Sequence, residues 1–70
     1  MTAAESLRDA TARLAPASAT PRLDAELLLA HTLGIERSDL LLKLRDVAVP
    51  DAFDALIDRR ASGEPIAHIV

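Results

Sequence analysis

The sequence of 70 residues has few of the residue types on which many functional sites depend. It contains no cysteine, so it forms neither a disulfide framework nor a thiolate metal site. It has only two glycines, which excludes the glycine-rich loops that cradle phosphate groups. Phe53 is its only aromatic residue, so its core must be aliphatic. The sequence therefore lacks most of the motifs by which a metal, nucleotide or cofactor site is recognised.

Long apolar runs and a strong positive charge are also missing. No apolar run approaches the roughly 18 residues of a membrane helix. The first residues include the acidic Glu5 and Asp9, whereas a secretory signal peptide has a basic segment followed by an apolar segment. The formal net charge of −3 disfavours a dedicated nucleic-acid binder and favours a basic partner. We therefore expect a cytoplasmic protein that binds neither membrane nor nucleic acid, and the lack of cysteine agrees with a reducing compartment.

What the sequence does contain is a strong helical pattern. Half of the residues are apolar, too many for a disordered segment. Every periodic segment has the helical period, and none alternates as a strand would. The length allows one domain at most, with a stability of about 3–5 kcal/mol. The sequence predicts an all-α fold: a small bundle of four helices plus a short fifth helix at the C-terminal end.

The first two helices have clear start and stop signals. Thr2-Ala3-Ala4-Glu5 is a capping box, and Pro16 ends the helix that it opens. Thr20-Pro21 begins a second helix, which Gly34 closes in the left-handed conformation. This second helix is apolar around most of its circumference, which places it at the centre of the bundle. We take its core stripe to be Leu23, Leu27 and Ala30.

The remaining helices are shorter. The third begins at Glu36 or Ser38 and continues to Arg45, and the fourth runs from Pro50 to Gly63. A short fifth helix begins at Pro65. The inward-facing residues that we expect in the third and fourth helices are Leu40, Leu41, Leu44, Phe53, Leu56 and Ile57.

No catalytic constellation emerges from the polar residues. His31 and His68 lie far apart without metal-ligand spacing, and we interpret His31 as structural. The pairs Asp24 and Glu26, and Asp51 and Asp54, are interpreted as solvated charge on polar helix faces.

Arg59-Arg60 fits the negative end of the helix dipole. The Arg60 stem is close to the apolar face, and its head group could hold Glu64 or a following domain.

One segment has the spacing of a helix-turn-helix. Ala30, Gly34 and Leu40 fit its small residue, turn glycine and core residue. The exposed face of the second helix in this motif would offer Asp39, Leu42, Lys43 and Arg45, which is poor material for reading bases or phosphates. A small DNA-binding regulator and a stand-alone helical interaction module therefore remain as alternatives.

Two stretches together resemble a known family. "PRLDAELLLAHTLG" (Pro21 to Gly34) and "RRASGEPIAHIV" (Arg59 to Val70) resemble the N-terminal domain of the HemK/PrmC family, the release-factor glutamine N5-methyltransferases. The resemblance extends from about Thr20 to the end, and His68 stands where the family commonly has tyrosine. Because a natural C-terminus is seldom as apolar as "IAHIV", we also expect residues 1–70 to be the front of a longer protein.

The resemblance implies a helical N-terminal substrate-recognition domain over residues 1–70, with the catalytic methyltransferase domain absent from them. That missing domain would bind S-adenosylmethionine and methylate the glutamine of the Gly-Gly-Gln loop of bacterial class I peptide release factors. No catalytic or cofactor-binding residue can be carried over to this chain, which we expect to be inactive alone. Its implied partners are the release factor and its own C-terminal catalytic domain.

Acidic side chains are the candidates for contact with the release factor. Asp51, Asp54 and Asp58 recur at three- and four-residue intervals, so they should form one ridge on the fourth helix. Glu36 and Asp39 at the start of the third helix are further candidates. For contact with a following domain, the candidates are Arg60, Glu64 and His68.

Overall fold

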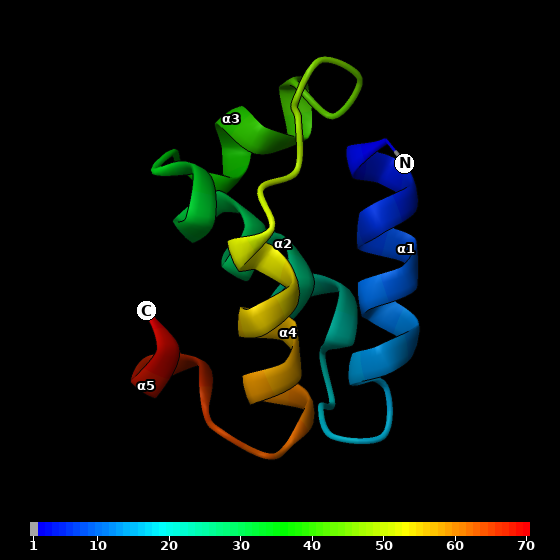
Figure 1. Cartoon of the computed structure of the whole chain (residues 1–70), viewed down its shortest axis with the longest axis vertical. Coiled ribbons are helices and arrows are strands. Elements are labelled where there is room, and N and C mark those ends of the chain that lie inside the picture. The colour runs from blue at the N-terminus through cyan, green and yellow to red at the C-terminus, as the bar shows by residue number, and fades with distance from the viewer. Residues whose placement is uncertain (1) are drawn as a thin grey trace.

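The computed structural model describes residues 2–70, and within them it contains five helices and no strand (Figure 1). The prediction of an all-α fold is therefore confirmed. The helices in chain order are α1 (Ala3–Leu14), α2 (Pro21–Leu33), α3 (Arg37–Leu42), α4 (Ala52–Ala61) and α5 (Ile66–Ile69). No helix among residues 2–70 combines the length and the apolar character that crossing a membrane requires.

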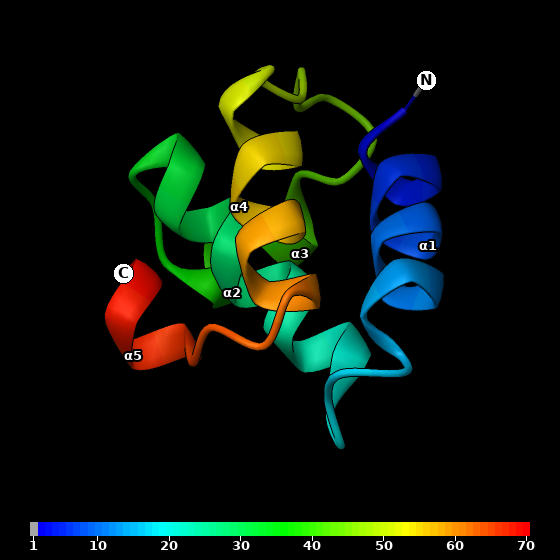
Figure 2. The ribbon, with the colours of Figure 1, turned by 60° about the horizontal axis from the view of Figure 1, so that its bottom comes forward.

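Helix α2 packs against α1, α3 and α4, and most extensively against α1, in agreement with its predicted central place. Figures 1 and 2 show α1 and α4 running side by side in the same direction, and α5 follows α4 through a short loop. The core between the helices is aliphatic apart from Phe53. Its fully buried large side chains are Leu7, Leu14, Leu28, Leu29, Leu40 and Ile57.

The predicted core stripe of α2 is wrong in two of its three positions. Leu23 is 39% exposed and Leu27 is only partly buried, whereas Leu28 and Leu29 are completely buried. A helix that is apolar on most sides offers several stripes of similar quality, so its own sequence does not select one. The selection comes from packing against the neighbouring helices, and it turns the Leu28–Leu29 side inward.

The capping box of α1 is confirmed. The Glu5 backbone N–H donates to Thr2 Oγ1 over 3.2 Å, and the Thr2 N–H donates to Glu5 Oε1 over 3.0 Å. The Thr2 backbone N–H, which donates to the charged carboxylate, holds the pKa of Glu5 below its ordinary value, and the Thr2 side chain adds to this effect. Gly34 ends α2 with a φ of 71°, which confirms the predicted left-handed closure.

Helix α3 is shorter than predicted and less buried. It ends at Leu42 instead of Arg45, and Lys43 closes it with an N–H bond to the Leu40 carbonyl. Leu40 is buried as predicted, but the expectation that Leu41 faces inward is wrong, because Leu41 is exposed. Leu42 is 84% exposed. One helical turn and a half can point only a few side chains at α2, and Leu40 takes that position.

Candidate protein-interaction site

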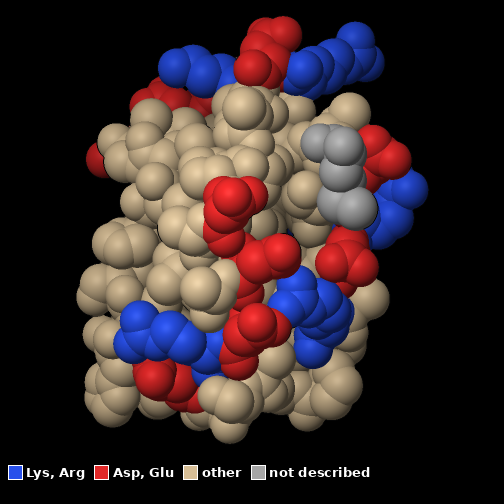
Figure 3. Space-filling view, in the orientation of Figure 1, with Lys and Arg blue, Asp and Glu red and all other residues tan. Residues whose placement is uncertain are grey.

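Three aspartates form the acidic ridge, which we define as Asp51, Asp54 and Asp58. All three are exposed, and they lie at the start and along the outer face of α4. Figure 3 shows acidic side chains following one another down the front of the molecule, with basic side chains beside them. The predicted ridge therefore exists as a geometric feature, with positive charge close to it.

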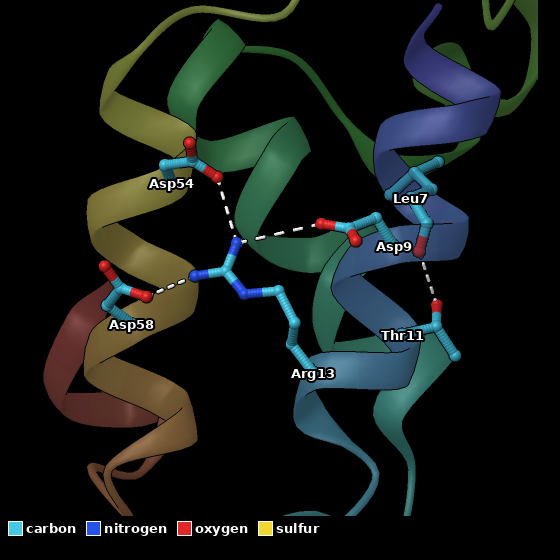
Figure 4. A network of polar contacts seen from close by, with 6 residues as sticks. All are labelled: Leu7, Asp9, Thr11, Arg13, Asp54 and Asp58. Carbon is cyan, nitrogen blue, oxygen red and sulfur yellow. Dashed lines mark hydrogen bonds and ion pairs between the residues drawn. The ribbon is translucent and has the colours of Figure 1, made fainter. Parts of the chain in front are cut away.

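Arg13 on α1 is the cation that the sequence reasoning did not connect to the ridge. Its Nη1 donates to Asp54 Oδ1 over 3.0 Å, and its Nη2 donates to Asp58 Oδ1 (Figure 4). The predicted pair with Asp9 is present, but at 3.9 Å it is the longest of the three. Partial burial alone would lower the pKa of Arg13, yet the bonds with Asp54 and Asp58 raise it above its ordinary value.

Arg13 thus bridges the two parallel helices α1 and α4. Asp54 is exposed as predicted, but its charge is partly neutralised by the guanidinium. Asp51 differs, because among residues 2–70 its side chain forms no hydrogen bond and no ion pair, even though it occupies the N-cap position of α4. Asp51 is consequently the ridge residue with the most charge left for a partner.

A surface groove of about 320 Å³ lies between α1 and the start of α4. Its apolar lining comes from Ala10 of α1 and from Val49, Pro50 and Phe53. Its charged lining consists of Asp9, Asp51 and Asp54 together with Arg13. The groove therefore combines an apolar surface with an excess of negative charge, and two of its carboxylates belong to the acidic ridge.

The interpretation of Asp24 and Glu26 as solvated charge is wrong. Asp24 is 6% exposed and Glu26 is 5% exposed, so both carboxylates are removed from water. Removing an ionised carboxylate from water is costly unless it is paired and hydrogen-bonded. Both residues meet this condition, each with at least one arginine that lies outside α2.

Asp24 receives three hydrogen bonds. Arg60 Nε and Ser18 Oγ donate to its Oδ2 over 3.1 and 2.5 Å, and Thr20 Oγ1 donates to its Oδ1 over 3.2 Å. Thr20 therefore supports α2 through Asp24, and it makes no side-chain cap to the helix backbone. The result is a link from α2 to the end of α4.

Glu26 is held between two arginines. Arg22 Nε donates to one of its oxygens over 2.7 Å, and Arg37 Nε donates to the other over 2.8 Å. Burial alone would raise the pKa of Glu26, but the bonds from Arg22 and Arg37 outweigh it and hold the pKa below its ordinary value. Since Arg37 is the first residue of α3, this carboxylate ties α3 to α2.

The predicted interdomain residues lie at the α4–α5 connection. Arg60 places its Nε on Asp24 and its Nη1 3.4 Å from the Glu64 carbonyl, so its head group holds this connection inside the domain. The Glu64 carboxylate forms an ion pair with Arg59. His68 is exposed on α5. Contact with a following domain stays a prediction for these residues.

The predicted contacts at α3 are exposed but separate from the ridge. Glu36 occupies the N-cap position of α3 without a side-chain capping bond, and Asp39 lies in the first turn. Helix α3 packs against α2 and is not among the elements that pack closely against α4. The exposed side chains on and just after α3 include Asp39, Leu42, Lys43 and Arg45, so an acidic and an apolar side chain interrupt the positive charge that phosphate contact needs. His31, predicted to be structural, is exposed.

Chemically, the part of the chain that the structure describes is a set of ion pairs on an aliphatic core. Within residues 2–70, no three His, Asp or Glu side chains are grouped so that they could hold a metal ion. The fold and the surfaces define a small helical domain whose charged faces suit contact with another protein.

The chain belongs to the family described as the PrmC N-terminal domain, whose model matches residues 5–70. It is 48% identical to the "Release factor glutamine methyltransferase" of Corynebacterium glutamicum, with all of the chain and 25% of that protein aligned. For the proteins of the same name from Mycolicibacterium smegmatis and Escherichia coli (strain K12), the identities are 48% and 43%. These two alignments cover 87% and 90% of the chain, but only 22% and 24% of the respective relatives.

The chain thus spans about a quarter of the length of the curated relatives that it matches. No solved structure matches it. The resemblance stated from the two sequence stretches is confirmed, and the family includes the first helix as well, because the match begins at residue 5.

Proposed function

We propose that residues 1–70 are the substrate-recognition domain of a release factor glutamine methyltransferase, and that they help to hold the release factor during methylation. The observation that carries this proposal is the family match over residues 5–70, together with relatives of that name aligned over 87% or more of the chain. The transfer of the methyl group, from S-adenosylmethionine to the glutamine of a Gly-Gly-Gln loop, is assigned to a catalytic domain outside these residues. The protein would act in the cytoplasm, where release factors work.

The residues of this chain do not fit S-adenosylmethionine. Sites of the Rossmann type bind their nucleotide at a glycine-rich turn between a strand and a helix. Here Gly34 lies in the α2–α3 connection and Gly63 in the α4–α5 connection, and residues 2–70 contain no strand. The role of these residues in methyl transfer is therefore to bind and orient the protein substrate.

Orientation by a separate domain has a clear kinetic consequence. Contacts with parts of a substrate far from the reacting atoms supply binding energy that positions the reacting group. A short Gly-Gly-Gln peptide would lack those remote contacts, whereas an intact release factor would have them. Loss of the recognition domain should therefore affect the intact protein much more than the peptide.

The test compares a full-length methyltransferase carrying this domain with a version from which the domain is deleted. For the intact release factor, kcat/KM should fall at least tenfold on deletion, while kcat/KM for the short peptide should change little. Circular dichroism and a cofactor-binding measurement on the deleted enzyme would show that the catalytic domain is still folded. Equal losses with both substrates would contradict a recognition role.

A further inference from the structure

The groove between α1 and α4 has the chemistry of a receptor for one long basic side chain. Its apolar lining, which includes Ala10, Val49 and Phe53, suits the methylene stem of a lysine or an arginine. Its carboxylates suit the cationic head group of such a side chain. A volume of about 320 Å³ is at the lower end of the range for ligand sites, roughly 300–1,000 Å³, so one extended side chain fits better than a cofactor.

The arrangement of charge leaves two carboxylates for a partner. The Arg13 guanidinium is directed at Asp54 and Asp58, as Figure 4 shows, and it lies 3.9 Å from Asp9. Asp9 on α1 and Asp51 at the start of α4 therefore remain the least neutralised acids of the groove. The positive end of the α4 dipole opposes a cation here, but it amounts to about half a charge and is outweighed by the carboxylates.

We propose that this groove receives a lysine or arginine side chain from a basic segment of the release factor, with Asp9 and Asp51 contacting its head group. The inference rests on the proposed function for the identity of the partner. Its chemical part, a preference for a cationic side chain in this groove, comes from the lining residues alone. The partner is a protein segment, since the groove has room for a side chain and carries negative charge that repels nucleic acid.

The test uses the 70-residue chain labelled with ¹⁵N and its Asp9→Asn, Asp51→Asn and Asp46→Asn variants. Asp46→Asn is the matched control, because Asp46 is an exposed aspartate in the α3–α4 connection and does not line the groove. Because the Asp51 side chain makes no capping hydrogen bond to α4, Asp51→Asn should leave that helix intact. The unchanged dispersion of the amide spectrum would show that each variant is folded.

In the first arm, the chain is titrated with a short arginine-containing peptide and with the same peptide carrying glutamine in place of arginine. The amide signals of Asp9, Ala10, Asp51 and Phe53 should move with the arginine peptide only. Asp9→Asn and Asp51→Asn should each weaken binding about two- to fivefold, as the loss of one partly exposed ion pair does, and Asp46→Asn should not. Equal shifts around all exposed acids, Asp46 included, would overturn the inference.

In the second arm, the peptide is replaced by a purified class I release factor. Binding by the wild-type chain that weakens in Asp9→Asn and Asp51→Asn, but not in Asp46→Asn, supports the groove as the seat of the partner. If these variants do not change binding, the groove is not the binding site of the release factor, whereas the proposed function is still supported. If the arginine peptide binds in the first arm but the wild-type chain does not bind the release factor, the result contradicts the proposed function. It does not contradict the preference of the groove for a cationic side chain.

Discussion

Replacing Arg60 by methionine removes the guanidinium that, among residues 2–70, pairs with the buried Asp24 carboxylate, while keeping an apolar stem of similar length. Breaking a buried ion pair by removing one partner costs about 3–5 kcal/mol, because the other charge stays buried without compensation. Asp24 would keep its hydrogen bonds from Ser18 and Thr20. These remaining bonds reduce the expected loss to about 2–3 kcal/mol.

A loss of this size is large for so small a domain. With a total stability of about 3–5 kcal/mol, Arg60→Met would leave the chain close to unfolding at 25 °C. Urea denaturation followed by circular dichroism is the assay. A slope of about 1 kcal/mol per molar urea, at the low end for small proteins, converts the loss into a midpoint shift of roughly 2–3 M.

Arg59→Met is the matched control, since Arg59 is the neighbouring arginine and its ion pair with Glu64 is half-exposed. Such pairs contribute about 0–1 kcal/mol, so the control midpoint should move by less than about 1 M. Combining Arg60→Met with Asp24→Asn should recover part of the stability, because the buried charge is then gone. Equal midpoint shifts for Arg60→Met and Arg59→Met would refute the assignment of Asp24 as a buried, Arg60-dependent carboxylate.

Two further stability predictions concern α2. Leu28→Ala should cost about 2–5 kcal/mol in urea denaturation, whereas Leu23→Ala should cost less than about 1 kcal/mol, and the reverse order would show that the sequence-based stripe was correct after all. Because the pKa of Glu26 is lowered in the folded state, its contribution is present above its ordinary value of 4.5 and is lost as the pH falls through the folded pKa. The urea midpoint, measured from pH 7 to pH 3, should therefore start to decrease once the pH is below about 4.5. Glu26→Gln should make this decrease smaller, and a decrease of the same size in the variant would contradict the role of Glu26.

The features that the sequence predicted well are those fixed by local chemistry. The Thr2–Glu5 capping box and the left-handed Gly34 depend on residues within one helical turn, and both are present. The central place of α2 followed from its apolar circumference. Each of these predictions needed no knowledge of what the helix would pack against.

The features that the sequence did not predict depend on residues distant in the chain. Asp24 is paired with Arg60, 36 positions away, and Arg13 with Asp54, 41 positions away. A carboxylate on a helix is ordinarily solvated, so nothing local distinguishes Asp24 from Asp51. The i,i+4 spacing of Arg22 and Glu26 was a usable local signal for one pair, but it did not reveal that Arg37 would complete the burial of Glu26.

The division of the carboxylates between structure and surface determines how the acidic ridge can be studied. Asp54 and Asp58 bind Arg13 and so connect α4 to α1, and lysine at either position would set two cations against each other across that contact. A loss of partner binding in such a variant would follow as readily from displaced helices as from lost attraction. Among residues 2–70, Asp51 makes no such contact between helices. Because its side chain is exposed, its negative charge can attract an approaching protein over a Debye length of about 8–10 Å. Its removal should therefore lower the rate of association with a basic partner, most clearly at low salt, while the packing of α1 against α4 is unchanged.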